Sequence, residues 1–318
     1  MNMFTSSCAL AKSQKIQYQF PVEDVHVVSW NARISAYSQK GHGEHAIHCF
    51  EEMQRKGFSP NIVTYICVLK ACGSIQAIND GVKIHEEIMS KGLLEGNIML
   101  GATLVDMYAK CGQLQTAAQV HGKLSTKNVI SWSALISGYV QHGYCEEALD
   151  CFASMRQAGF SPNAFTYSCI MKACGSTRES EKGRKFHEEI VCKGILAGDI
   201  VLGNSLIDLY AKCGDLTKAQ GVFDELPGRN IISWSTLISG YSQHGHGQDA
   251  LACYLQMQNE GIFANSITST SILKACSSSK SLDKGKMMHT QILSNGLWNK
   301  KIALGNALVD MYAKCGAI

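Results

Sequence analysis

The sequence has little charge, little proline and no long apolar run. Charged residues make up 17% of its 318 residues, only four residues are proline, and the formal net charge is +3. There is thus no basic field over the whole chain, so a polyanionic partner would have to be met by a local stripe of positive charge. No apolar run approaches the roughly 20 residues that span a membrane. With 46% apolar residues, the composition predicts a folded, soluble and helix-rich chain.

Signatures of catalysis and of metal binding are absent as well. The sequence contains no P-loop, no nucleophile elbow, no HExxH motif and no CxxC pair. His42-Gly43-Glu44 matches one half of a zinc-deaminase signature, but the cysteine half is missing. We therefore expect no enzyme, no bound metal and no cofactor. The histidines that recur once per repeat are expected to be structural: His85, His187 and His289.

Fourteen cysteines are present, yet they do not predict a disulfide framework. Eleven of them occupy positions locked to an internal repeat, and only Cys8, Cys145 and Cys192 fall outside it. The chain is also longer than the small secreted domains that depend on disulfides. We expect small apolar packing residues in a reducing compartment.

An internal repeat is the strongest feature of the chain. LVDMYAKCG at 104–112 returns as LIDLYAKCG at 206–214 and as LVDMYAKCG at 308–316, at a constant offset of 102 residues. Such a repeat indicates the architecture before any single residue does. Each full unit contains sub-units of 35, 36 and 31 residues. The predicted boundaries are 27–61, 62–97, 98–128, 129–163, 164–199, 200–230, 231–265 and 266–301, with a partial sub-unit at 302–318 and a separate segment at 1–26.

Each sub-unit is predicted to form two helices. In 129–163, Ser131 is expected to cap the first helix, and the apolar residues from Trp132 to Tyr139 recur at the spacing of one helical face. The second helix is expected to begin near Cys145 and to stop at Gly159. A pair of helices this short cannot bury both faces alone, so stacked pairs predict an all-α superhelical solenoid. The repeated tryptophans are assigned to its core: Trp30, Trp132 and Trp234.

These repeats resemble the pentatricopeptide repeats of the plant PLS class over roughly residues 27–318. VISWSALISGY with GFSPN resembles a P motif, YSCIMKACGS with GRKFHEEIV a long L motif, and VLGNSLIDLYAKCG with VFDELPGRN a short S motif. The resemblance implies a right-handed superhelix of antiparallel helix pairs that binds single-stranded RNA in a plant mitochondrion or chloroplast, one base per repeat. It also implies a role in RNA processing, or in specifying sites of cytidine-to-uridine editing.

The resemblance further assigns base recognition to the fifth and last residues of a motif. An asparagine pair implies a pyrimidine, and serine with asparagine implies adenine; Ala102 with Asn128 departs from the code, and the L motifs follow it poorly. Small polar groups repeated once per helix pair suit unpaired base edges, although the last residues could equally be helix caps. The implied base-recognition residues are Asn31 with Asn61, Ser133 with Asn163, Asn204 with Asn230, Ser235 with Asn265, and Asn306.

Two further ladders follow from the same resemblance. The second residue of each motif is implied to pinch a base between neighbouring repeats, with core packing as the alternative: Val28, Ile130, Val201 and Ile232, with Val63, Phe165 and Ile267 in the L motifs. The thirteenth residue of each S motif is implied to contact phosphate, with ordinary solvated lysines as the alternative: Lys110, Lys212 and Lys314. A second lysine series recurs in the L motifs at Lys70, Lys172 and Lys274.

The ends of the chain carry weaker predictions. Residues 1–26 have the composition of a weak organelle presequence or of a degenerate repeat. The sequence stops at Ile318 inside a repeat, which indicates a fragment or truncated gene product. No E or DYW extension is present, so editing would need the missing C-terminus or a separate deaminase. The unfinished last repeat is expected to expose Leu308 and Met311. The competing function is a peptide-binding scaffold of the tetratricopeptide kind, which a constant 34-residue period would favour.

Overall fold

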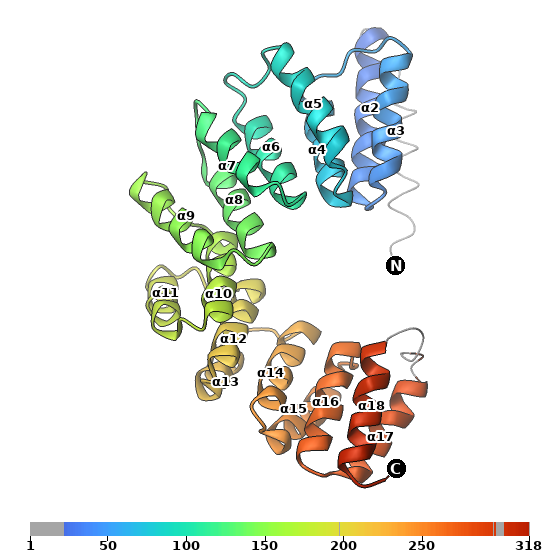
Figure 1. Ribbon diagram of the computed structural model, residues 1–318, viewed down its shortest axis with the longest axis vertical. Coiled ribbons are helices and arrows are strands. Elements are labelled where there is room, and N and C mark those ends of the chain that lie inside the picture. The colour runs from blue at the N-terminus through green and yellow to red at the C-terminus, as the bar shows by residue number, and fades with distance from the viewer. Residues whose placement is uncertain (1–21, 197, 295, 297–301, 318) are drawn as a thin grey trace. The chain divides into compact units, whose positions relative to one another are not determined.

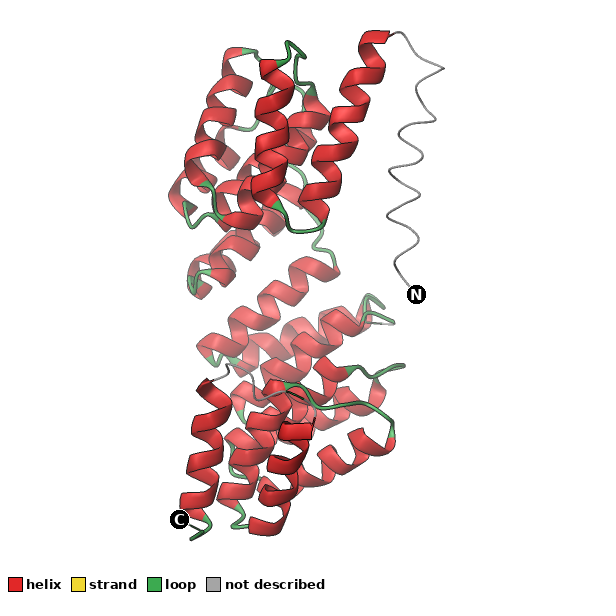
Figure 2. Ribbon diagram, turned by 90° about the vertical axis from the view of Figure 1, so that its right-hand side faces the viewer, coloured by secondary structure: helices red, strands yellow, loops and turns green. Residues whose placement is uncertain are grey.

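The computed structural model describes residues 22–196, 198–294, 296 and 302–317. The described residues form helices α2 to α18 and contain no strand (Figures 1 and 2). The predicted all-α fold is therefore confirmed. Most of the expected presequence, including Cys8, lies outside the described residues. The chain divides into two compact units, Met1–Ser161 and Pro162–Ile318, which we describe separately.

The first unit is a stack of four helix pairs. Its first helices pack against one another in chain order and form one layer. The second helix of each pair packs against its own first helix, and in the first three pairs it also packs against the first helix of the next pair. The order along the stack can be followed from blue to green in Figure 1. The pairs are α2 (Val22–Gln39) with α3 (Gly43–Arg55), α4 (Ile62–Ile75) with α5 (Ile78–Ser90), α6 (Ile98–Lys110) with α7 (Leu114–Lys123), and α8 (Val129–Gln141) with α9 (Cys145–Gln157).

The second unit repeats this arrangement and ends on an unpaired first helix. Its layer of first helices runs from α10 to α18 through every even-numbered helix. Both units are thus helical-repeat solenoids. The elements are α10 (Ala164–Thr177) with α11 (Ser180–Cys192), α12 (Ile200–Cys213) with α13 (Leu216–Glu225), α14 (Ile231–Gln243) with α15 (Gly247–Asn259), α16 (Ser266–Ser278) with α17 (Leu282–Ser294), and α18 (Ile302–Lys314).

The first helices begin where the repeat boundaries fall in the sequence. From α4 onward, each begins at the first residue of a range defined by the 35, 36 and 31 residue spacing, whereas α2 begins at Val22 instead of 27. The cap of α8 was predicted wrongly. Asn128 is the N-cap, and Ser131 is the third residue of the helix. The Ser131 hydroxyl accepts from the backbone N–H of Asn128 at 3.3 Å. This reciprocal capping box satisfies two backbone donors at once.

The tryptophans lie in the core, as predicted. Trp30, Trp132 and Trp234 are exposed by only 7%, 9% and 0%. Trp30 packs on Phe58, with ring centroids 6.5 Å apart, and Trp234 packs edge-on against Phe223 at 4.6 Å. Burial of a large side chain of this kind contributes about 1.5–3 kcal/mol, so the tryptophans hold the stack together and are not available to stack on a ligand.

The expected exposure of the last helix is wrong for the two residues named. Leu308 is 4% exposed and Met311 is fully buried, because α18 packs against α16 and α17. Met311 reaches so close to Gly285 of α17 that a Cβ there would lie 2.3 Å from its sulfur. Val309 of the same helix is exposed instead, at 65%.

Small residues let neighbouring first helices approach closely. A Cβ added to Gly138 of α8 would lie 2.5 Å from the Cβ of Ala109 on α6, and one added to Gly240 of α14 would lie 2.7 Å from the Cβ of Ala211 on α12. Larger residues would push these helices apart. The close packing therefore sets the spacing at which the side chains of successive motifs meet on the layer of first helices.

Candidate nucleic-acid interface

The last residue of a motif is the N-cap of the next first helix. A side-chain oxygen at this place accepts from a backbone N–H of the first turn, and six of the seven described caps do so. The alternative that these residues are helix caps is therefore confirmed for their side-chain oxygens. The capping residues are Asn61, Asn128, Asn163, Asp199, Asn230 and Asn265, whereas Asn97 holds the same place without such a bond.

Capping leaves the side-chain amide nitrogen of these asparagines able to donate a hydrogen bond elsewhere. The cap uses only Oδ1, while Nδ2 carries two hydrogens and is a donor. Asn61 and Asn163 are exposed, and Asn128, Asn230 and Asn265 are half-buried. Each of these residues can therefore hold its helix in place and still offer a donor to a ligand.

The fifth residues lie beneath this surface rather than on it. Asn31, Ser133, Asn204 and Ser235 are only 9%, 4%, 8% and 6% exposed, whereas Asn306 on α18 is exposed. Sequence periodicity placed them on the first helix but did not indicate such deep burial. Asn31 and Ser235 belong to hydrogen-bonded clusters that join one motif to the next.

The pair Asn31 and Asn61 is brought together in the first unit. The Asn31 amide Nδ2 donates to Asn61 Oδ1 at 3.1 Å, and Thr64 Oγ1 donates to Asn31 Oδ1 at 2.6 Å. Thr64 is the third residue of α4 and also donates its backbone N–H to Asn61 at 3.1 Å. The two predicted residues, of which Asn61 is the cap of α4, thus form one cluster with Thr64.

The pair Ser235 and Asn265 is joined in the same way in the second unit. Ser235 Oγ lies 2.7 Å from Thr268 Oγ1, and Thr268 Oγ1 lies 3.1 Å from Asn265 Oδ1. Ser235 also donates to the Ile231 carbonyl at 2.6 Å. Ser133 belongs to the first unit and Asn163 to the second, so each of these is described only within its own unit.

Asn204 on α12 has an acceptor that nothing in the described chain satisfies. Its Oδ1 is buried, and no donor among the described residues reaches it. A buried acceptor left without a partner costs about 1–3 kcal/mol. This atom is therefore suited to accept a hydrogen bond from a ligand.

The second residues of the motifs form an exposed apolar series. Val28, Ile130, Val201 and Ile232 are 49%, 48%, 65% and 56% exposed, so the alternative that they pack in the core is wrong. The corresponding L-motif residues Val63, Phe165 and Ile267 are exposed by 53%, 53% and 62%. Exposed apolar side chains in such a regular series indicate a binding surface.

A groove on the second unit collects several of the predicted residues. It has a volume of about 240 Å³ and lies along α12, α14 and α16. Its walls include the second residues Ile232 and Ile267, the fifth residue Ser235 and the last residue Asn265. The S-motif pair Lys212 and Asp208 also lines it. Apolar, hydrogen-bonding and charged groups therefore face one space.

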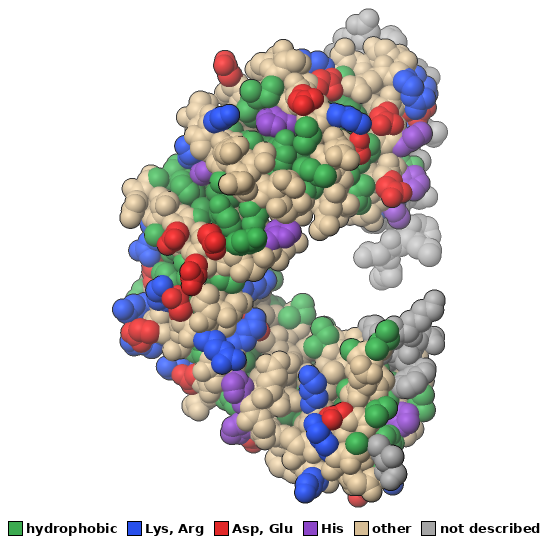
Figure 3. All heavy atoms as spheres, viewed as in Figure 1, with side chains coloured by type: hydrophobic (Ala, Val, Ile, Leu, Met, Phe, Trp, Pro, Cys, Tyr) green, Lys and Arg blue, Asp and Glu red, His purple; other side chains and the backbone are tan. Residues whose placement is uncertain are grey.

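The S-motif lysines are already paired, although Lys212 and Lys314 are exposed and Lys110 is half-buried. Each nitrogen lies 2.7–2.9 Å from an aspartate one helical turn earlier, in the pairs Asp106–Lys110, Asp208–Lys212 and Asp310–Lys314. The aspartates were missed in the sequence, although acid and lysine four residues apart are a recognisable helical pair. Figure 3 shows acidic and basic side chains interspersed over the face drawn.

The L-motif lysines differ. Lys70, Lys172 and Lys274 are exposed and form no salt bridge with any residue that the structure describes. Lys274 lies beside Ile267, Thr270 and Ala303 in a second groove of about 290 Å³. These lysines therefore present a full positive charge on the layer of first helices.

The recurring histidines and cysteines have structural surroundings. His85 Nδ1 lies 2.8 Å from the Tyr108 hydroxyl, a contact repeated between His187 and Tyr210 and between His289 and Tyr312.

Burial raises the pKa of the Cys72, Cys151 and Cys174 thiols to about 12, so they stay neutral. All cysteines in the described ranges are free thiols, and no group there gathers three metal-binding side chains. Within the same ranges, no helix is both long and apolar enough to cross a bilayer.

Comparisons with known proteins agree with this architecture. The PPR repeat family model matches residues 25–74, 127–176 and 229–278, and a second PPR repeat model matches 165–195 and 204–231. A chloroplastic pentatricopeptide repeat-containing protein of Arabidopsis thaliana is 36% identical over 93% of this chain and 48% of its own length. A mitochondrial one from the same plant is 34% identical over 92% of this chain and 28% of its own length.

A solved structure shares the fold. The crystal structure of the pentatricopeptide repeat protein PPR10 in complex with an 18-nt psaJ RNA element is 20% identical, with a TM-score of 0.57 over 93% of this chain and 49% of that one. This chain thus spans about half, or less, of the length of these relatives. Repeated helix pairs, their caps and the matched family models lead to one conclusion: the chain belongs to the pentatricopeptide repeat family.

Proposed function

We propose that this chain binds single-stranded RNA in a sequence-selective manner in a chloroplast or mitochondrion. The observation that carries the proposal is the groove along α12, α14 and α16, where apolar, amide, hydroxyl and lysine groups face one space. Helical repeats of this kind read one base each. The location is supported by the chloroplastic and mitochondrial relatives, and the ligand by the RNA bound to PPR10.

We assign three tasks to the residues of this groove. The exposed side chains of Ile232 and Ile267 hold a base between them. The Asn265 amide, whose oxygen caps α16, donates from Nδ2 to an acceptor on the base edge. Ser235 sets the depth and polarity of the site through its contact with Thr268.

The resulting expectation is a site with four or five specified bases. In the 5′ to 3′ direction, the motifs at 27–61 and 200–230 read pyrimidines, those at 129–163 and 231–265 read adenines, and Asn306 reads a further pyrimidine. Motifs at 62–97, 98–128, 164–199 and 266–301 are assigned no base. Such an array would act as the specificity element of RNA processing or cytidine-to-uridine editing, with any deaminase supplied by a partner.

Replacing Ser235 with Asn tests the assignment most sharply. The first unit already holds an asparagine in the same surroundings, since Asn31 contacts Thr64 and Asn61 as Ser235 neighbours Thr268 and Asn265. The S235N variant should therefore fold. We expect its preference to change from adenine to pyrimidine at one nucleotide, with a discrimination of about 1–3 kcal/mol. Selection from a randomised RNA pool, followed by titration of two RNAs that differ in that base, measures the change.

The matched control is Ser168→Asn. Ser168 is the fifth residue of an L motif, which we assign no base, and its hydroxyl lies 2.6 Å from Ser205 Oγ. The control should leave the preferred sequence unchanged. A folded S235N protein that still prefers adenine would overturn the register, and a protein that binds no RNA of any sequence would overturn the proposed function.

A further inference from the structure

The three P–L junctions of the chain differ at one buried position. In the first two, a tyrosine at the fourth place of the L motif is fully buried: Tyr65 on α4 and Tyr167 on α10. The Tyr65 hydroxyl donates to Glu87 at 2.8 Å, and Lys91 donates to the same hydroxyl at 2.8 Å. Tyr167 makes the corresponding contacts with Glu189 and Lys193, at 2.8 and 3.1 Å.

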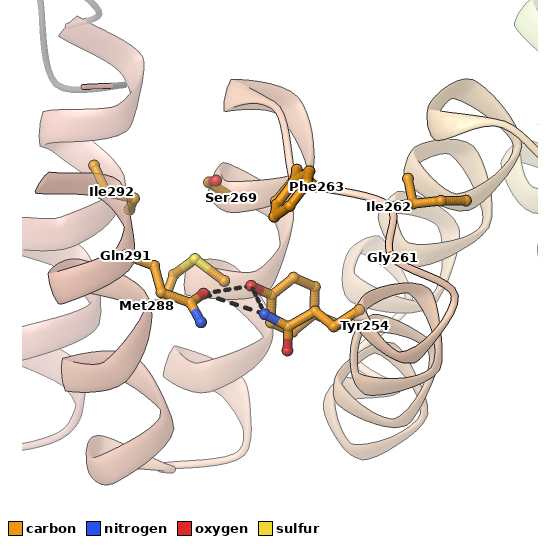
Figure 4. A pocket seen from close by; sticks show the side chains of 10 residues that line it. Tyr254, Gly261, Ile262, Phe263, Ser269, Met288, Gln291 and Ile292 are labelled. Carbon is orange, nitrogen blue, oxygen red and sulfur yellow. Dashed lines mark hydrogen bonds between the residues drawn. The ribbon is translucent and has the colours of Figure 1, made fainter. Parts of the chain in front are cut away.

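In the third junction the 102-residue offset places Ser269 where the tyrosines stand. The glutamate is replaced by Gln291, and the phenylalanine at positions 50 and 152 is replaced by Tyr254. A serine cannot fill the space of a phenol ring. The result is a cavity of about 270 Å³ enclosed by α15, α16, α17 and the loop at 260–265 (Figure 4).

The lining of this cavity is neutral, apolar on one side and hydrogen-bonding on the other. Gln258 Nε2 donates to the Tyr254 hydroxyl at 2.9 Å, and that hydroxyl donates to Gln291 Oε1. Met288 and Ile292 are buried and form part of the apolar wall. The Gln291 amide nitrogen donates to no described residue, so it is available to a ligand. The charged glutamate and lysine of the sister junctions have no counterpart among these lining residues.

The rim of the cavity is also particular to this junction. Phe263 is 83% exposed, more than any other large apolar side chain among the described residues. Serine stands at the equivalent positions 59 and 161. An aromatic ring therefore lies at the mouth of a cavity that lacks the aromatic ring of its sister junctions, and aromatic pairs are favourable edge-on or offset.

We propose that this cavity receives the tyrosine side chain of a protein partner. The two sister junctions show that a phenol ring fits this position of the repeat, with its hydroxyl on the side chain at the place of Gln291. The Gln291 amide donates to the incoming hydroxyl, Met288 and Ile292 contact the ring, and Phe263 covers its edge. The cavity is lined by different residues from those of the proposed RNA groove, so both can be occupied in one molecule.

The test uses the whole chain, p-cresol as the tyrosine side-chain analogue, and an acetylated Gly-Tyr-Gly amide with its phenylalanine counterpart. Amide chemical shifts are followed by NMR during titration. We expect p-cresol and the tyrosine peptide to shift the same amides on α15, α16 and α17, and the phenylalanine peptide to bind at least threefold more weakly. No shifts in these helices at millimolar p-cresol, or binding of p-cresol without the tyrosine peptide, would overturn the proposal.

A filled cavity provides the matched variant. The double substitution Ser269→Tyr with Tyr254→Phe restores both sister residues, so its packing has a precedent in Phe50 and Tyr65, whose ring centroids lie 6.1 Å apart. It should bind p-cresol at least tenfold more weakly and melt at a higher temperature. Phe263→Ser, which keeps the cavity and restores the sister residue at the rim, should weaken the peptide more than p-cresol. Unchanged p-cresol binding by the filled variant would place the ligand elsewhere, and neither result depends on RNA binding.

Discussion

The first helices of the L motifs and those of the S motifs carry the same number of lysines but not the same available charge. On α4, α10 and α16 the lysine at the ninth place is free, whereas on α6, α12 and α18 the lysine at the thirteenth place is held by an aspartate at the ninth. The P motifs have serine at that ninth place. The comparison teaches that the number of regularly spaced lysines in a sequence overestimates the positive charge available to phosphate, because some of these lysines are paired with aspartate.

The largest expected effect comes from removing the free lysines. Replacing Lys70, Lys172 and Lys274 with Ala should weaken the binding of every RNA sequence, because each contact to a single strand contributes about 0.7 to the salt slope. We expect the slope of log affinity against log salt to flatten by about two. Fluorescence anisotropy between 50 and 200 mM salt measures it. An unchanged slope would remove these lysines from the interface.

A gain of binding is expected when the paired lysines are released. Replacing Asp106, Asp208 and Asp310 with Asn keeps the size of each side chain but removes its charge, so the three lysines become free to meet phosphate. Affinity at low salt should rise, and the slope should steepen by about 0.7 for each released lysine that reaches a phosphate. The same titration detects this change. If affinity stays constant, these lysines do not face the RNA even when released.

The smallest effect is expected when each pair is removed as a unit. Replacing both members of the Asp106–Lys110, Asp208–Lys212 and Asp310–Lys314 pairs with Ala leaves the net charge constant. The salt slope should change by less than about 0.7, and each lost pair should cost the folded chain about 0.3–0.5 kcal/mol. Thermal melting and the anisotropy titration give the two numbers. A flattening of two or more would instead support the phosphate contacts implied by the family resemblance.

Much of the fold could be predicted from spacing because the repeat is local. The boundaries at Ile62, Val129 and Ile231 follow from the 35, 36 and 31 residue periods, and each is the first residue of a helix. The burial of Trp234 follows from the helical spacing of its apolar neighbours. Such features depend on residues within one or two turns, which the sequence displays directly.

The candidate site was less predictable because it is made between motifs. Asn31 is hydrogen-bonded to Asn61 and Thr64, which lie 30 and 33 residues away in the chain, and no local pattern indicates that contact. The cap at Asn128 was missed in favour of Ser131, because both residues suit a helix start and only the backbone decides between them. The cavity left at Ser269 is visible in sequence only when the three copies are aligned with knowledge of what Tyr65 and Tyr167 bury.

The capping residues both start a helix and are assigned to base recognition, and this limits which substitutions can change the bases that such an array prefers. A replacement at the end of a motif must keep an oxygen for the helix start, or lose about 1 kcal/mol of stability. The described caps accordingly use a two-letter alphabet of Asn and Asp, whereas the fifth residues of the same seven motifs include Asn, Ser, Ala and Ile. New binding preferences should therefore arise first at the fifth place of the motif, where a substitution does not remove a helix cap.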